Sequence, residues 1–336
     1  MRDTGTDDPR VRIRPNRRGS RPRTKIRPDY DDALTARVYR VDRGRYHLIL
    51  DESGTAVVSV KARELGRGAI AVGDRVAVVG DTSGRKDTLA RIVKVLERTS
   101  TLRRTAEEGE AAGNERVIVA NADKLLIITA LAQPEPRTGM IDRCLVAAYD
   151  GGMEPILVLT KSDLADPTPL LDHYRNLEMR VLSTWINEEM GQTDGVDVVA
   201  SEVAGSISVL VGHSGVGKST LINALVPDAE RATGSVNEVT GRGRHTSSSA
   251  IAFDLADGGV IIDTPGVRSF GLAHVDPDML LEAFPDLIPL AEECPRGCTH
   301  AETEPECGLD SATEQTAERV ESYRRLLEAR HNAEQF

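Results

Sequence analysis

The sequence predicts a multidomain α/β protein with an OB-like β-barrel before the α/β domain and a helical zinc-binding domain after it. Short runs with strand character fill residues 34–100, strands alternate with helices over 112–274, and cysteines cluster with a histidine within 275–336. The predicted domains are a basic arm (1–33), an OB-fold barrel (34–100), a P-loop α/β domain (112–274) and a zinc-binding domain (275–336).

The bulk composition fits a soluble globular chain of two or three domains. The chain has 336 residues and is 40% hydrophobic, but only 3% aromatic, so aliphatic side chains must build its cores. No apolar run is long enough to span a bilayer, and the N-terminus is basic rather than signal-like. We therefore expect a cytoplasmic protein with no membrane partner.

Charge is divided unevenly along the chain. Residues 1–28 hold ten Arg or Lys and three Asp, which gives +7, so a total of −11 leaves −18 on the remainder. Such an arm is typical of a disordered tail that neutralises phosphates, and a solvated tail without a partner is the alternative.

Five strand-like runs separated by Gly and Asp turns predict the barrel. They are Ala36–Val41, Tyr46–Leu50, Ala56–Val60, Arg75–Val79 and Arg91–Leu96. Barrels of this kind often bind RNA, and Tyr39, Tyr46 and His47 are candidate stacking groups. The alternative is that these rings fill the barrel.

After a polar stretch at 99–114, which we predict to be a linker, continuous apolar strands alternate with helices. The predicted strands are 116–121, 125–130, 156–159, 207–211, 250–255 and 260–262, and the predicted helices are 139–149, 169–176 and the one that follows residue 220. This alternation predicts a parallel sheet covered on both faces. Cys144 falls in an apolar helical stretch and is interpreted as a core residue.

A strand, a glycine-rich loop and a helix predict a nucleotide-phosphate site. The loop residues are Gly212, His213, Ser214, Gly215, Val216, Gly217, Lys218, Ser219 and Thr220, and they match G-x-x-x-x-G-K-[ST]. The loop N–H groups would surround a phosphate, with Lys218 on the β- and γ-phosphates and Ser219 on Mg²⁺. A ligand-free glycine turn is the alternative.

A second motif comes directly after the strand that ends at Leu159. It consists of Thr160, Lys161, Ser162 and Asp163. Asp163 would accept hydrogen bonds from both N–H groups on the edge of guanine, which adenine cannot offer, while Lys161 would lie over the purine.

Two further segments complete the predicted site. Asp263 would hold Mg²⁺ through water, and the Gly266 N–H would contact the γ-phosphate, although Asp-Thr-Pro-Gly is also a good turn sequence. The Gly241–Thr246 stretch has the composition of a mobile loop, with Thr246 as the second Mg²⁺ ligand. Ordinary solvated charges are the alternative for Arg242, Arg244 and His245.

Three thiolates and one imidazole predict a structural zinc site near the C-terminus. The ligands would be Cys294, Cys298, His300 and Cys307, within fourteen residues. A disulfide would leave one cysteine unpaired and is unexpected in the cytosol. A closed set of four ligands would hold together a module too small for its own core.

These motifs are those of a GTPase, but the guanine motif precedes the phosphate loop, so the sheet must be circularly permuted. With the barrel in front and the Cys/His cluster behind, residues 34–336 closely resemble the ribosome small subunit-dependent GTPase A family (RsgA, also called YjeQ), including Gly-x-Gly-Arg-His-Thr at 241–246 and Asp-Thr-Pro-Gly-Val-Arg at 263–268. Thr160 stands where the family usually has Asn, and the second guanine loop, expected near 183–186, matches poorly.

The resemblance implies a GTPase that binds the small ribosomal subunit and its rRNA, assists late maturation of the subunit and leaves after hydrolysis. Its cofactors would be GTP or GDP, Mg²⁺ and one structural Zn²⁺, and we expect a monomer. Val267 replaces the glutamine that often orients the attacking water, so His245 is the candidate for that role, beside Lys218 and Thr246 as catalytic groups. The alternatives are a nucleotide-gated rRNA-binding module in which hydrolysis is incidental, and a P-loop ATPase or kinase, against which Asp163 argues.

Overall fold

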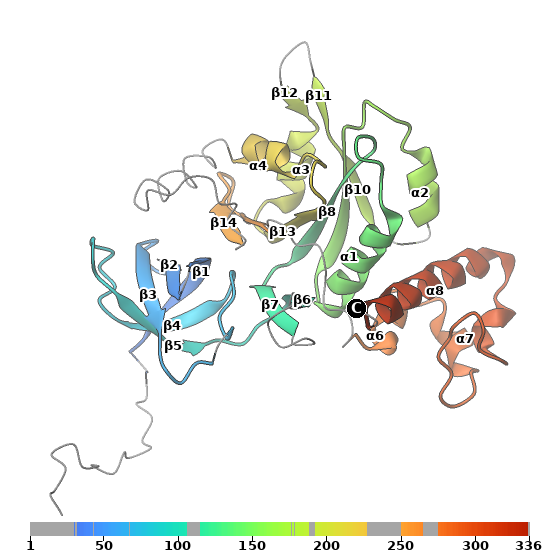
Figure 1. The fold of residues 1–336 in the computed structure, drawn as a ribbon, viewed down its shortest axis with the longest axis horizontal. Coiled ribbons are helices and arrows are strands. Elements are labelled where there is room, and N and C mark those ends of the chain that lie inside the picture. Colours follow the sequence, from blue (N-terminus) through green and yellow to red (C-terminus); the bar gives the residue numbers. More distant parts are fainter. Residues whose placement is uncertain are drawn as a thin grey trace, which may run out of the picture. The chain divides into compact units, whose positions relative to one another are not determined.

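The structure, a computed structural model, describes residues 30, 32–42, 44–66, 68–105, 115–175, 177, 179–187, 192–226, 250–264 and 275–334. Figure 1 shows a group of N-terminal strands, a sheet with helices beside it, and C-terminal helices. No helix in these ranges is both long enough and apolar enough to cross a membrane.

The N-terminal strands form a closed barrel, as predicted. They are β1 (Leu34–Asp42), β2 (Arg45–Leu50), β3 (Ala56–Lys61), β4 (Arg75–Gly80) and β5 (Ala90–Val95). They are paired in the order β1-β2-β3-β5-β4, and β4 pairs with β1 again to close the ring. Alternate residues such as Val38, Leu48 and Ile92 point inward and are fully buried, because successive side chains of a strand face opposite sides. The five strands lie within a few residues of their predicted positions.

The prediction of a linker at 99–114 is wrong for its first part. Thr101–Thr105 forms β6, which pairs antiparallel with β7 (Glu115–Ala120). Leu102 lies opposite Val119 in this hairpin, and both side chains are buried in the largest core cluster. A polar stretch with one buried leucine has too weak a periodicity to predict a strand, so cross-strand pairing decides its structure here.

The main sheet of the α/β domain is parallel, with one antiparallel strand. Its strands are β8 (Lys124–Ala130), β9 (Glu154–Thr160), β10 (Arg180–Ser183), β13 (Ile207–Gly212), β14 (Ile251–Asp254) and β15 (Val260–Asp263). They lie in the order β10-β9-β8-β13-β15-β14, and only β14 is antiparallel to its neighbour in this order. The carboxyl ends of the parallel strands therefore share one edge, where Thr160, Gly212 and Asp263 each end a strand.

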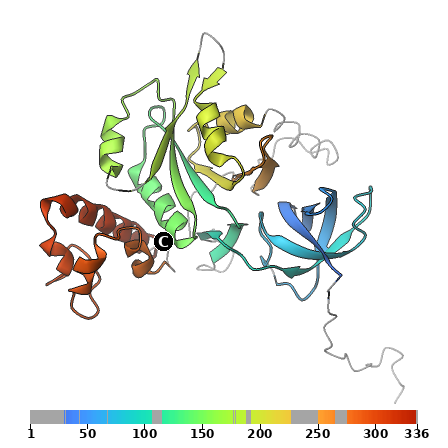
Figure 2. The same cartoon turned by 180° about the vertical axis from the view of Figure 1, so that it is seen from behind.

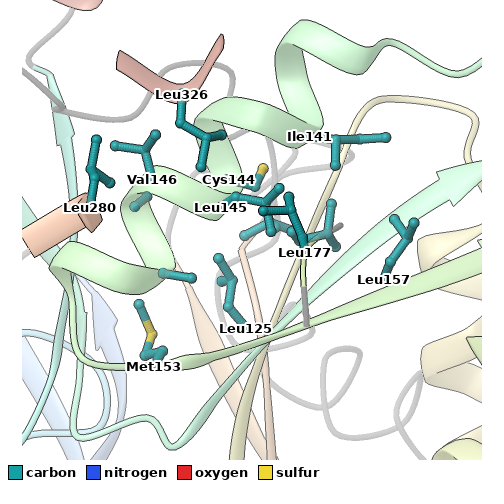
Figure 3. Packing of buried hydrophobic residues seen from close by; sticks show 14 of the residues in the cluster. Leu125, Ile141, Cys144, Leu145, Val146, Met153, Leu157, Leu177, Leu280 and Leu326 are labelled. Carbon is teal, nitrogen blue, oxygen red and sulfur yellow. The ribbon is translucent and has the colours of Figure 1, made fainter. Parts of the chain in front are cut away.

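Helices cover both faces of this sheet, as the continuous apolar strands predict (Figures 1 and 2). They are α1 (Thr138–Asp150), α2 (Thr168–Tyr174), α3 (Val196–Val203) and α4 (Lys218–Leu225). Leu125 and Leu157 face α1 and α2, and Figure 3 shows them near Ile141 and Leu145 of α1. Alternate strand residues, among them Leu126, pack on the other face with α3 and α4. Cys144 of α1 is fully buried, which confirms its predicted place in the core, and burial raises its pKa.

Four elements of the α/β domain were not predicted. They are β10, α3 and a hairpin of β11 (Trp185–Asn187) with β12 (Gln192–Asp194).

The C-terminal helices pack on α1. They are α6 (Pro277–Leu281), α7 (Ile288–Glu292), the 3₁₀ helix η1 (Gly308–Ser311) and α8 (Glu314–Glu334). Leu280 and Leu326 belong to the same core cluster as Val146 of α1, and all three are fully buried (Figure 3). The buried Asp142 of α1 accepts hydrogen bonds from Arg325 Nε of α8 at 3.2 Å and from Tyr174 Oη of α2 at 3.0 Å. The core cluster that holds Val146, Leu280 and Leu326 thus joins residues on both sides of position 275. The predicted domain boundaries remain predictions.

Candidate nucleotide site and metal centre

The predicted phosphate loop joins β13 to α4. Gly215 and Gly217 have φ angles of +84° and +88°, a region that residues with a Cβ rarely adopt. A Cβ on Gly212 would lie 2.7 Å from the carbonyl oxygen of Ile128 on the neighbouring strand. These glycines let the chain turn from the buried strand into the first turn of α4. The arrangement is typical of a loop whose N–H groups face an anion.

Lys218 and Asp263 meet at the end of this loop. Lys218 Nζ forms an ion pair with Asp263 Oδ1 and lies 3.2 Å from the carbonyl oxygen of Thr264. Thr264 is buried and donates its hydroxyl to Leu210 O at 2.7 Å, which fixes the end of β15 against β13. Ser219, which follows Lys218, is exposed. The hydroxyl of Ser219 and the carboxylate of Asp263 are the hard oxygen ligands that Mg²⁺ prefers, so these residues fit the predicted ion.

The guanine motif is bonded to the phosphate loop through two of its residues. Thr160 is buried and donates its hydroxyl to Val216 O at 2.5 Å, while Lys161 Nζ lies 3.0 Å from Gly215 O. Lys161 Nζ also bonds the carbonyl oxygen of Gln133. The structure therefore brings together two motifs that are more than fifty residues apart in the sequence. The hydroxyl of Thr160 provides a contact to the phosphate loop at the position where the family usually has Asn.

The segment at 183–186, where a second guanine loop was expected, lies beside the guanine motif. Thr184 follows β10, and its carbonyl oxygen accepts from the N–H and the hydroxyl of Ser162, both at 3.2 Å. Asp163 is exposed. Recognition of Arg180–Ser183 as a parallel strand would have placed Thr184 at the sheet edge that carries the other motifs.

Sequence reasoning also missed two residues in the segment between β8 and α1. Arg137 NH1 lies 2.8 Å from Nε2 of His213 in the phosphate loop, and Gln133 contacts Lys161 as described above. Neither residue belongs to a recognisable motif.

Several predicted residues lie outside the described ranges. They are His245 and Thr246 in the 241–246 stretch, Gly266 and Val267 after Asp263, and the basic arm at 1–28. Their predicted roles remain predictions.

The four predicted zinc ligands converge on one point. Their ligand atoms all lie within 4.8 Å of one another. His300 Nδ1 is 3.5 Å from Cys294 Sγ, 3.6 Å from Cys298 Sγ and 3.8 Å from Cys307 Sγ, and the sulfurs of Cys294 and Cys307 are 3.9 Å apart. A tetrahedral zinc ion with Zn–S near 2.3 Å and Zn–N near 2.0–2.1 Å requires about 3.8 Å between sulfurs and about 3.6 Å from sulfur to nitrogen. The cluster fits a zinc ion, and no disulfide is formed, since all the cysteines are free.

Backbone N–H groups near the cluster support thiolate ligands. The backbone N–H of Gly308 donates to Cys294 Sγ at 3.1 Å, and that of His300 points to Cys298 Sγ at 3.4 Å. Burial raises the pKa of Cys298 to about 11 and lowers that of His300. A divalent cation reverses this preference for neutral thiols, because a coordinating thiol loses its proton.

The barrel aromatics differ in exposure. Tyr46 is buried inside the barrel, so it fills the core and is not a stacking group. Tyr39 and His47 are half-buried, with ring centroids 5.8 Å apart in an edge-to-face arrangement. These two rings remain candidates for stacking on a base.

Comparison with known proteins finds a matching family and similar chains. A family model described as RsgA GTPase matches residues 95–273. The small ribosomal subunit biogenesis GTPase RsgA of Pseudomonas syringae pv. tomato is 38% identical over 269 residues, which cover 77% of this chain and 74% of the relative. The protein of the same name from Ectopseudomonas mendocina is 39% identical over 246 residues, which cover 70% of this chain and 69% of the relative.

Two solved structures support the fold. The crystal structure of YjeQ from Thermotoga maritima has a TM-score of 0.61 at 24% identity and covers 89% of this chain and 98% of its own. The crystal structure of YloQ, a circularly permuted GTPase, has a TM-score of 0.62 at 21% identity and covers 92% of this chain and 98% of its own. The predicted circular permutation is thus confirmed. The family match and the identity to these relatives show that the chain belongs to the RsgA GTPase family.

Proposed function

We propose that this chain is a GTPase that binds the small ribosomal subunit, assists its late maturation and is released when GTP is hydrolysed. The observation that carries the proposal is the convergence of three separate motifs at one sheet edge, where Thr160 and Lys161 contact the phosphate loop and Lys218 contacts Asp263. The relatives' names, which specify small ribosomal subunit biogenesis, supply the partner. We infer a monomer that acts in the cytoplasm, where small subunits mature.

In the proposed site, the loop from Gly212 to Thr220 surrounds the phosphates, and Asp163 pairs with the guanine edge. Lys218 would leave Asp263 to contact the β- and γ-phosphates, where its positive charge offsets charge that develops during hydrolysis. Mg²⁺, held by Ser219, Thr246 and Asp263, would neutralise phosphate oxygens. The Gly266 N–H would contact the γ-phosphate.

The attacking water needs a positioning group, because Val267 is apolar. His245 is the proposed group, adjacent in sequence to the proposed Mg²⁺ ligand Thr246. If a large RNA partner brings His245 into its acting position, hydrolysis would be coupled to that partner. The zinc cluster would be structural, because four protein ligands leave no open position for substrate.

Asp163→Asn tests guanine recognition. The amide keeps one acceptor but loses the charge and one of the two hydrogen bonds to guanine, so the Kd for GDP is expected to rise about tenfold to fiftyfold. Asn also offers a donor that fits the carbonyl of xanthine, so the variant should gain affinity for XDP. Calorimetry of GDP, XDP and ADP binding measures both effects, with Asp166→Asn, an exposed Asp nearby, as the control. Equal GDP affinity in wild type and Asp163→Asn would contradict the proposed guanine site.

A further inference from the structure

Side chains from outside the phosphate loop bond it at three closely spaced positions. Thr160 bonds Val216 O and Lys161 bonds Gly215 O, and both belong to the guanine motif. The third position is His213, whose Nε2 lies 2.8 Å from Arg137 NH1. Arginine can only donate, so His213 accepts at Nε2 and carries its proton on Nδ1.

Arg137 is held in place by its own segment, which joins β8 to α1. The N–H of Leu131 donates to Thr160 O at 3.0 Å, and Gln133 O accepts from Lys161. At the other end, the carbonyl oxygen of Arg137 accepts from the N–H groups of Met140 and Ile141, at 3.0 and 3.2 Å, in the first turn of α1. The segment is therefore fixed at both ends, and its last side chain reaches the phosphate loop.

We propose that Arg137 is a positioning residue of the nucleotide site, which acts through His213 to hold the phosphate loop in its binding conformation. The inference rests on the proposed nucleotide site. Gly215 and Gly217 have positive φ angles, and the turn bond within the loop, from the Val216 N–H to His213 O, is long at 3.5 Å. Contacts from neighbouring segments therefore help to fix the shape of the loop. A loop fixed before the ligand arrives loses less conformational freedom on binding.

The charge of Arg137 adds a second contribution. Its guanidinium is permanently positive, and a cation beside the phosphate loop favours the approach of a polyphosphate. Because Arg137 is exposed, solvent weakens both contributions. We expect the loss of Arg137 to weaken nucleotide affinity about three- to tenfold. A tenfold change corresponds to about 1.4 kcal/mol, and a threefold change to about half of that.

The experiment measures the Kd for GDP and the kcat for GTP hydrolysis with the full-length chain. The variants are Arg137→Ala, Arg137→Lys, His213→Ala and the double alanine variant. Arg180→Ala is the matched control, since Arg180 is an exposed arginine of the same domain that pairs with Glu202 instead. Melting temperatures identify any variant that is destabilised as a whole.

Arg137→Ala is expected to raise the Kd for GDP three- to tenfold, with a smaller change in kcat, because positioning the loop helps substrate and transition state alike. His213→Ala should have a similar effect, and the double variant should be no worse than the worse single variant, since both remove one contact. Arg137→Lys, which keeps the charge and a donor, should fall between wild type and Arg137→Ala. The inference would be overturned if the losses of affinity in Arg137→Ala and His213→Ala add fully in the double variant. It would also be overturned if the Kd of Arg137→Ala stays within twofold of wild type. If wild type itself fails to bind GDP, the proposed nucleotide site is wrong, and the two failures are thus distinguished.

Discussion

Lys218→Ala is expected to lower kcat for GTP hydrolysis about 10²- to 10³-fold, the usual loss when one preorganised donor to developing charge is removed. Lys218 begins α4, at the end of the phosphate loop, and its ammonium group already lies between Asp263 and the carbonyl oxygen of Thr264. Phosphates that enter the loop would compete with Asp263 for this ammonium. The variant would lose that charge at the position where the γ-phosphate is transferred.

Single-turnover hydrolysis of GTP at saturating enzyme measures this loss without the contribution of product release. Lys86→Ala is the matched control, because Lys86 is an exposed lysine of the barrel domain. The control should hydrolyse GTP at the wild-type rate. A Lys218→Ala variant that retains more than a third of the wild-type rate would place the phosphates elsewhere.

Cys307→Ser is expected to abolish stoichiometric zinc binding and to release the C-terminal helices from α1. Cys307 is buried and shares a core cluster with Leu309, Tyr323 and Leu326, so the metal site and the packing of α8 form one unit. The Tyr323 ring lies 6.1 Å from that of His300, and Arg324 Nε donates to His300 O at 3.0 Å. Structural zinc contributes on the order of 10 kcal/mol of apparent binding free energy in small zinc peptides. Without it, the loop at 294–307 has little apolar surface to hold it.

Zinc content per chain and amide exchange across residues 275–334 measure the two effects of Cys307→Ser. Cys144→Ala is the matched control, since Cys144 is a buried cysteine of α1 that is not part of the Cys/His cluster. This control removes one sulfur from the core and should cost about 1 kcal/mol of stability while zinc remains at one per chain. Zinc retained at one per chain in Cys307→Ser would show that Cys307 is not a ligand.

The elements that the sequence predicts well are those with strong local signals. The phosphate loop combines an apolar strand, glycines at fixed spacing and a following helix, and the structure has all three in place. The barrel strands have period-two burial and turn residues at both ends. The zinc ligands are close together in the sequence, so their convergence in space is a short-range consequence of their spacing.

The elements that the sequence predicts poorly depend on partners far along the chain. The strand β10 has only four residues and becomes a strand because it pairs with β9. The same holds for β6, which is polar but pairs with β7. Arg137 and His213 are 76 positions apart, and no periodicity or motif relates them, so their contact follows only from the topology of the sheet. The sequence does not predict the hydroxyl contact of Thr160 with Val216 O either, because it shows only that the usual Asn is absent.

We propose a GTPase whose active site is completed by the small ribosomal subunit. Steady-state hydrolysis of GTP, with and without purified small subunits and with ATP as the control nucleotide, tests this proposal most directly. We predict slow hydrolysis by the chain alone, a large stimulation by small subunits that is specific for GTP, and loss of the stimulation in His245→Ala. Slow turnover that small subunits leave unchanged would contradict the account.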